Sequence, residues 1–296
     1  MLLILLMPDA IVDSGEAVRA SPLAWLRAVL AAAGIDPAGA AVDLRLDGPR
    51  PLRVAHRAGV PVHPASLCKL FFLAAAQAWL ETGRLEAGPE LERALAAMIR
   101  ESSNDATSYV LDRLTGTTSG PELAPAALAE WMVRRGAVNR HFQAAGPFAA
   151  GCNLTQKTWA DGPYGRERQG RAIDPHGGNR LSASAVADLL DAIAAGRAVS
   201  PARSAAMLAL LERDLDPARR APGDQVEGFL GAGLPPGSRL WSKSGWTSTL
   251  RHDAALVALP GGVRFRLVVL TEGRAASADA RALPALAAAV VRDVER

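Results

Sequence analysis

Lysine is scarce in this chain. Of the 33 basic residues only three are lysines, Lys69, Lys157 and Lys243. Arginine serves as well as lysine where only surface charge is needed, but a site that needs a compact ammonium, or one able to lose its proton, needs lysine. The formal net charge is only +3, and there is no basic stripe with interleaved aromatic residues, which argues against a nucleic-acid partner. We therefore interpret the arginines as solvated surface charge and expect the lysines to lie in a functional site.

Cysteine and long apolar runs are also rare. Cys68 and Cys152 are the only cysteines, too few for a disulfide framework. No segment has the roughly 18 or more consecutive apolar residues of a membrane span. The apolar start, residues 1–7, is too short for the core of a signal peptide and has no basic residues before it. We expect no membrane association and a cytoplasmic protein as given, or a periplasmic one if the start is truncated.

Two further signatures are missing. The histidines show no metal-ligand spacing such as His-x-x-x-His, so we expect neither a metal nor another cofactor. No Gly-x-Ser-x-Gly elbow is present, which argues against the hydrolases built on that turn.

Apolar periodicity and turn residues predict the element order. Helices are expected at 21–33, 66–81, 91–98, 106–114, 182–195, 201–214 and 276–294. Strands are expected at 41–46, 51–56, 240–243, 254–259 and 265–270, with a hairpin turn at 47–49. Residues 115–179 are rich in Gly and Pro and weakly periodic, so we expect a loop-rich region packed by aromatic side chains.

This order predicts a single catalytic domain with two lobes. An α/β lobe, an antiparallel sheet flanked by helices, would be assembled from about 1–62 and 236–296. An all-helical lobe would be inserted between them, over about 63–235. A cleft between two such lobes is a usual place for a site.

The first chemical motif is Ser66-Leu67-Cys68-Lys69, at the start of a long apolar helix. A spacing of three puts Ser66 and Lys69 on one helical face, one turn apart. A lysine whose pKa is lowered by burial or by a nearby cation can take the serine proton. His63, three residues before Ser66, could line the cleft, but we expect a capping or packing role.

Two more motifs follow along the chain. Ser102-Ser103-Asn104 could aim a hydroxyl and an amide at one point, or could simply cap the next helix. Lys243-Ser244-Gly245-Trp246 ends a predicted strand, where Gly245 permits close backbone approach and a substrate carboxylate could meet the Lys and Ser. Arg251, at the start of the next strand, could add a forked carboxylate contact.

Together, in this order, the three motifs resemble the Ser-x-x-Lys, Ser-x-Asn and Lys-[Ser/Thr]-Gly set of the class A β-lactamases and penicillin-binding proteins. The resemblance runs from about residue 41 to the C-terminus. It implies the two-lobe fold and an attack by Ser66 on an amide, with Lys69 as general base. Ser102 would pass a proton to the leaving nitrogen, and Lys243 would keep the local field positive.

The resemblance also assigns binding roles. Asn104 would bind a substrate amide oxygen, and Ser244 and Arg251 would hold a carboxylate. The backbone N–H groups of Ser66 and Trp246 would form the oxyanion hole.

The chain departs from the family where fast β-lactamases carry a Glu that activates the deacylating water. No Glu-x-x-Leu-Asn lies between Asn104 and Lys243. Glu167 or Asp161 could take that role, although Glu167 is flanked by two arginines and could form a structural ion pair instead. Lys157 lies in the same segment, and we expect it to face the cleft.

The expected function is therefore hydrolysis of an amide, β-lactam first, through an acyl-enzyme on Ser66. A peptidase-like or other small-amide amidohydrolase is the near alternative. A second class is a covalent sensor that acylates once and deacylates slowly. The expected partner is a small-molecule amide, with the oligomeric state left open.

Overall fold

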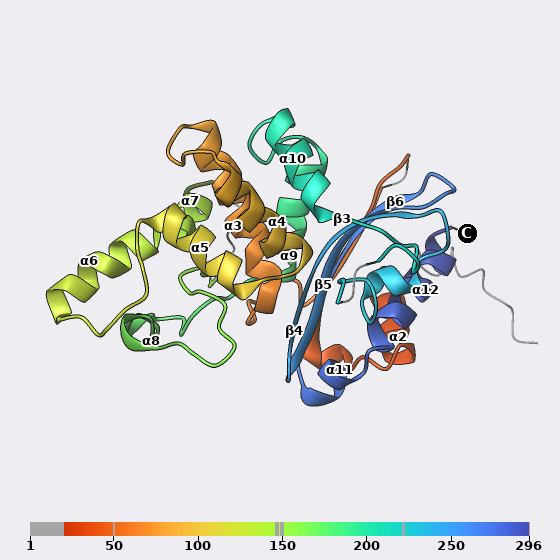
Figure 1. The fold of residues 1–296 in the computed structure, drawn as a ribbon. Helices are drawn as coiled ribbons and strands as arrows, with labels where there is room; N and C mark the ends of the chain where they lie inside the picture. The colour runs from red at the N-terminus through yellow and green to blue at the C-terminus, as the bar shows by residue number, and fades with distance from the viewer. Residues whose placement is uncertain (1–20, 50, 146–147, 149–150, 221–222, 296) are drawn as a thin grey trace, which may run out of the picture.

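The protein, described here by a computed structural model over residues 21–49, 51–145, 148, 151–220 and 223–295, has two lobes (Figure 1). One lobe contains a six-stranded antiparallel sheet in the order β2-β1-β6-β5-β4-β3. The strands are β1 (Ala40–Leu46), β2 (Leu52–His56), β3 (Glu212–Arg213), β4 (Arg239–Thr247), β5 (Leu250–Ala258) and β6 (Arg264–Thr271). The structure confirms the expected hairpin, formed by β1 and β2. It also confirms the three strands expected near the C-terminus, which are β4, β5 and β6.

The sheet separates two hydrophobic cores. Its central strands alternate their side chains, so that Leu267 and Val269 of β6 pack on one side and Val268 and Leu270 on the other. The first side is covered by α2 (Pro22–Ala32), α11 (Arg274–Ala278) and α12 (Ala282–Val294) (Figure 1). Val226 and Leu230 also pack in this core, although they precede residue 236, where we expected the α/β lobe to resume.

The other side of the sheet faces the helical lobe. Its central helix, α3 (Cys68–Glu81), is buried almost all round, as expected for a helix in the middle of a core. Helices α4 (Pro89–Arg100), α5 (Asn104–Thr115), α7 (Ala137–Ala145) and α10 (Pro201–Leu211) pack against it. The lobe also contains α6 (Pro125–Arg135), α8 (Gly165–Ile173) and α9 (Ala183–Ala194).

The expectation of a loop-rich region at 115–179 is wrong in part, because α6, α7 and α8 lie within it. In α6 and α8 the apolar periodicity is weak because charged side chains take part in the packing, whereas α7 buries the apolar Val138 and Phe142. The only buried residues of α8 are Glu167 and Gly170. In α6 the guanidinium of Arg135 is buried over the Trp131 ring, 4.5 Å from its centroid. The aromatic packing that we expected there is confirmed at this contact.

Helix α9 ties the two lobes together through ion pairs. Asp191 is 2.5 Å from Arg45 of β1 and 2.5 Å from Arg266 of β6. All three side chains are mostly buried, while the neighbouring Asp188 is 45% exposed and pairs with Arg45 alone. In the part of the chain that the structure describes, no helix is long and apolar enough to cross a membrane.

We expect Asp191→Asn to lower the free energy of unfolding by about 1–3 kcal/mol, because it removes one partner from two mostly buried guanidinium groups. The matched control, Asp188→Asn, should cost less than about 0.5 kcal/mol because that carboxylate is solvated. Urea unfolding of both variants measures the difference. Equal losses would contradict the bridging role of Asp191.

Candidate active site

Ser66 lies in the turn that feeds the central helix. The 3₁₀ turn η2 (Ala65–Leu67) precedes α3, and Ala65 has a left-handed backbone, φ 46°. Strained backbone next to a reactive group is common at active sites. A Cβ added at Gly245 would lie 3.0 Å from the Ser66 nitrogen and 3.0 Å from the Pro64 carbonyl oxygen, so a larger residue there would press on the turn that carries Ser66.

Two histidines hold the segment before Ser66. His252 is fully buried, and its Nδ1 accepts the Thr271 N–H at 3.0 Å. Its Nε2 therefore carries the proton and donates to the His63 carbonyl at 2.9 Å. The His63 ring in turn accepts the Ala65 N–H, so the expected capping role of His63 is confirmed.

Lys69 reaches the second motif. Its Nζ is hydrogen-bonded to the Ser102 carbonyl at 2.5 Å, to Asn104 Oδ1 at 2.8 Å and to Ser102 Oγ at 3.2 Å. The side chain is buried, and this burial lowers the pKa of the Lys69 ammonium to about 8.

Lys243 approaches Ser102 from β4. Its Nζ donates to Ser102 Oγ at 2.9 Å, to the Ser244 carbonyl at 2.8 Å and to Gln225 Oε1. Burial lowers its pKa well below the usual value, and the nearby charge of Lys69 lowers it further. Because the Ser102 oxygen accepts from both lysines, the hydroxyl proton is left to be donated elsewhere.

The loop that carries Ser102 is clamped at the end of α4. Arg213 of β3 donates to the carbonyls of Ile99 and Arg100, and Gln225 Nε2 donates to the same two carbonyls. Carbonyls at a helix C-terminus lack hydrogen-bond partners within the helix, and the Arg213 and Gln225 side chains supply the missing donors. Ser102 itself has a left-handed backbone, φ 58°, which this clamp holds in place.

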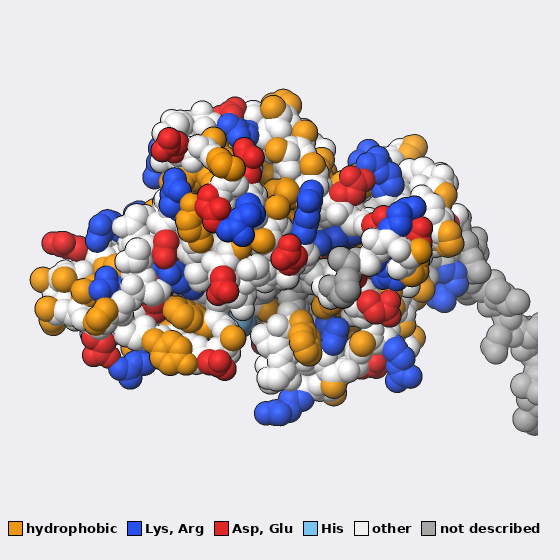
Figure 2. Space-filling model, in the orientation of Figure 1, with side chains coloured by type: hydrophobic (Ala, Val, Ile, Leu, Met, Phe, Trp, Pro, Cys, Tyr) orange, Lys and Arg blue, Asp and Glu red, His pale blue; other side chains and the backbone are white. Residues whose placement is uncertain are grey.

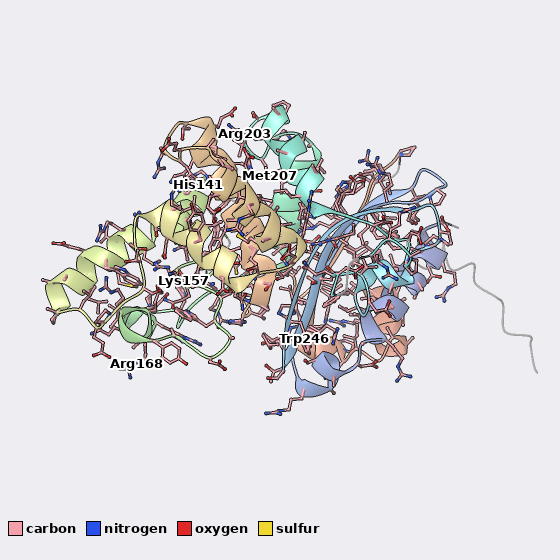
Figure 3. The ribbon with its side chains drawn as sticks, viewed as in Figure 1. His141, Lys157, Arg168, Arg203, Met207 and Trp246 are labelled. Atoms are coloured by element: carbon pink, nitrogen blue, oxygen red, sulfur yellow. The ribbon has the colours of Figure 1, made fainter. Side chains whose placement is uncertain are left out.

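Ser66 opens onto a pocket of about 150 Å³. Of the residues expected in the site, Ser66, Asn104, Lys157 and Trp246 line it, and His63 does so as well. The other lining residues are Ala65, Gln156, Thr158, Trp159, Gly162, Arg171, Gly177, Gly178, Asn179 and Thr247. Figure 2 shows the surface notched between the two lobes, and Figure 3 shows Lys157 and Trp246 on opposite sides of that notch.

The expected carboxylate-binding pair is directed elsewhere. Ser244 Oγ donates to Gln225 Oε1 at 2.9 Å, and Ser244 is almost fully buried. Arg251 donates to the carbonyls of Ser277 and Gly228. Neither Ser244 nor Arg251 lines the pocket that Ser66 opens onto.

The acidic candidates do not line the pocket either. Glu167 has no exposed surface; its Oε1 accepts from Arg135 at 2.6 Å and from Ser119 at 2.9 Å. The ion-pair alternative for Glu167 is thus confirmed, with Arg135 of α6 rather than an adjacent arginine as its partner. Asp161 is exposed to solvent. Lys157 lines the pocket as expected, but its ammonium points away from it, to Asp112 at 2.7 Å and Ser119 at 2.8 Å.

Several residues of the site escaped the sequence reasoning, and Gln225, Gln156 and Arg171 matter most among them. Gln225 follows a Gly- and Pro-containing segment with no motif around it, and Gln156 and Arg171 lie in the region expected to be loops. Nothing in the sequence distinguishes them. Over the described ranges, no group of three or more His, Cys, Asp or Glu side chains is arranged to hold a metal ion.

A larger, open cavity of about 980 Å³ lies beside β3. Its lining includes the charged residues Arg213, Asp214 and Arg219 and none of the residues of the three motifs. The smaller pocket is the candidate active site because Ser66 lines it.

Comparison with known proteins supports the fold. Solved structures of the same fold include a β-lactamase from Xanthomonas campestris pv. campestris str. ATCC 33913, at a TM-score of 0.66 and 19% identity over 97% of this chain and 100% of that chain. A β-lactamase from Sphaerobacter thermophilus DSM 20745 follows at 0.65 and 20%, over 91% and 97% of the two chains. The structure of PBP-A gives 0.63 and 17%, over 91% and 95%.

Among curated proteins there is no significant match. The model of the β-lactamase enzyme family matches residues 26–294, nearly the whole chain. The chain therefore belongs to the β-lactamase enzyme family.

Proposed function

We propose that this protein cleaves an amide bond of a small molecule, a β-lactam first, through an acyl-enzyme on Ser66. The observation that supports this most is the convergence of two buried lysines on one serine hydroxyl beside the nucleophile turn. Such an arrangement has little structural use, since burying two ammonium groups side by side is costly.

Acylation would begin with a neutral Lys69. It takes the Ser66 proton while Ser66 Oγ forms a bond to the substrate carbonyl carbon, and the oxyanion is stabilised by the N–H groups of Ser66 and Trp246. The C–N bond then breaks. Ser102 donates its proton to the departing nitrogen and is reprotonated from Lys69, with Lys243 stabilising the serine oxygen in between.

Binding of the substrate would use the pocket residues next to the nucleophile. The Asn104 side-chain amide, fixed by its bond to Lys69, can donate its N–H to the substrate's amide oxygen. The exposed Trp246 offers an apolar surface at the rim, held there by the Nε1 bond to Ser277 Oγ at 3.1 Å.

Deacylation is the step for which a second candidate function has specific support. None of the pocket-lining residues in the described ranges is an Asp or Glu, and Glu167 is engaged with Arg135. A water molecule entering this pocket would therefore lack a carboxylate base. We infer that hydrolysis of the acyl-enzyme is slow, so a covalent penicillin-binding or sensor role is the alternative to fast turnover, as is a peptidase-like reaction on another small amide.

Intact-mass spectrometry with a penicillin, over time, tests the proposal. We expect the protein to gain the mass of the penicillin, and Ser66→Ala to gain nothing. A long-lived adduct would favour the sensor or peptidase-like function, while a transient adduct with accumulating product would favour a β-lactamase. The absence of any adduct, with Ser66 still reactive to a fluorophosphonate, would contradict a β-lactam substrate.

The pH dependence of acylation tests the role of Lys69. Only the neutral amine can accept a proton, and the pKa of Lys69 is lowered to about 8 by burial. The acylation rate should therefore rise about tenfold per pH unit below this value and level off above it. Lys69→Ala should lower the rate by about a hundredfold or more and remove this inflection. A rate that does not change between about pH 6 and 9 would contradict Lys69 as the base.

A further inference from the structure

The Lys-Ser-Gly end of the site is already occupied by the protein itself. Gln225 Oε1 accepts hydrogen bonds from Lys243 Nζ, from the Ser244 N–H at 3.2 Å and from Ser244 Oγ at 2.9 Å. One oxygen thus takes the three donors that would otherwise meet a substrate carboxylate. The amide nitrogen of Gln225 is held at the end of α4, so the side chain is fixed at both ends.

The opposite wall of the pocket has the unused groups. Gln156 lines the pocket and is 5% exposed, yet neither its Oε1 nor its Nε2 has a hydrogen-bond partner in the described part of the chain. Its backbone is fixed by Asn179, which accepts the Gln156 N–H at 2.8 Å and donates to the Gln156 carbonyl at 2.8 Å. A buried amide without partners on a rigid backbone is suited to receive a ligand group.

Arg171 lies beside this amide. A Cβ at Gly178 would be 3.6 Å from Gln156 Cγ and 3.7 Å from Arg171 Nε, so the two side chains pack against the same glycine. Arg171 is exposed, and its Nε donates to the Gly177 carbonyl at 3.0 Å. No carboxylate of the described residues forms an ion pair with it.

The surroundings of this wall are positive. Arg180, which donates to the Pro61 carbonyl, likewise has no acidic partner in the described ranges. Burial, together with the charges of Arg171 and Arg180, lowers the pKa of His63 at the same pocket. The described lining includes no Asp or Glu, so nothing there offsets the charge of Arg171.

We propose that Arg171 and Gln156 form an anion subsite that binds a carboxylate of the substrate, in place of the Ser244 and Arg251 pair. The guanidinium would take the carboxylate oxygens, and the Gln156 amide nitrogen would donate to the same group. This inference rests on the proposed function, since it concerns the substrate that acylates Ser66.

The experiment measures acylation of Ser66 by two matched pairs of penicillins, by intact mass. One pair is a penicillin and the methyl ester of its ring carboxylate; the other differs by a carboxylate on the acyl side chain. The wild-type protein should prefer the carboxylate form in at least one pair. Arg171→Gln should lower that preference about tenfold, because it removes one charge-assisted contact. Gln156→Glu should lower it as well, because it places a negative charge in the subsite.

The matched control is Arg168→Gln, on the same helix and with the same loss of charge. Arg168 pairs with Glu122 on the surface, and Figure 3 shows it on α8, away from the notch (Figure 2). It should leave the preference unchanged. If Arg171→Gln keeps the preference for the carboxylate form, the subsite is overturned. It is overturned as well if the preference is lost in Arg251→Gln and kept in Arg171→Gln. A fluorophosphonate titration of Ser66 shows that each variant is folded. If no penicillin acylates the wild-type protein, that result counts against the proposed function and not against the subsite.

Discussion

Two buried lysine side chains meet at one serine hydroxyl, and much of the structure serves to hold them there. Lys69 comes from the central helix of the helical lobe and Lys243 from the sheet, so their meeting at Ser102 fixes the two lobes relative to one another. Burial lowers the pKa of both amines, and the charge of Lys69 lowers the pKa of Lys243 further. The scaffold holds the pair in place through its packing and its other hydrogen bonds.

The supporting contacts are built around this constraint. Arg213 and Gln225 fasten the end of α4 to β4, so the loop with Ser102 cannot move away from Lys243. Gly245 lets β4 lie against the turn that carries Ser66. Gln225 has a double effect, because the same oxygen that satisfies Lys243 also occupies the donors of Ser244. A side chain that stabilises the lysine pair thereby closes one place where a substrate anion could bind.

The sequence was sufficient for the parts of the site in which chemistry is concentrated in short motifs. With so few lysines, Lys69 and Lys243 were conspicuous, and the long apolar helix and the strand pattern placed them correctly. Helices α6 and α8 were missed because their buried positions include the charged residues Arg135 and Glu167, so neither helix has a continuous apolar face. The position of Glu167 depends on a partner 32 residues away, and that of Gln225 on contacts 18 and 126 residues away. Contacts between residues so far apart in the sequence produce no local sequence pattern from which they could be predicted.

Nuclear magnetic resonance of protein isotope-labelled at lysine Nζ shows whether Lys69 loses its proton within the working pH range. Because the chain has only three lysines, the spectrum has three side-chain signals, which single Lys→Arg variants assign. The Lys69 signal should titrate at about pH 8. Titration at the ordinary lysine value, above about pH 10, would show a permanently charged Lys69 and would contradict its role as the base.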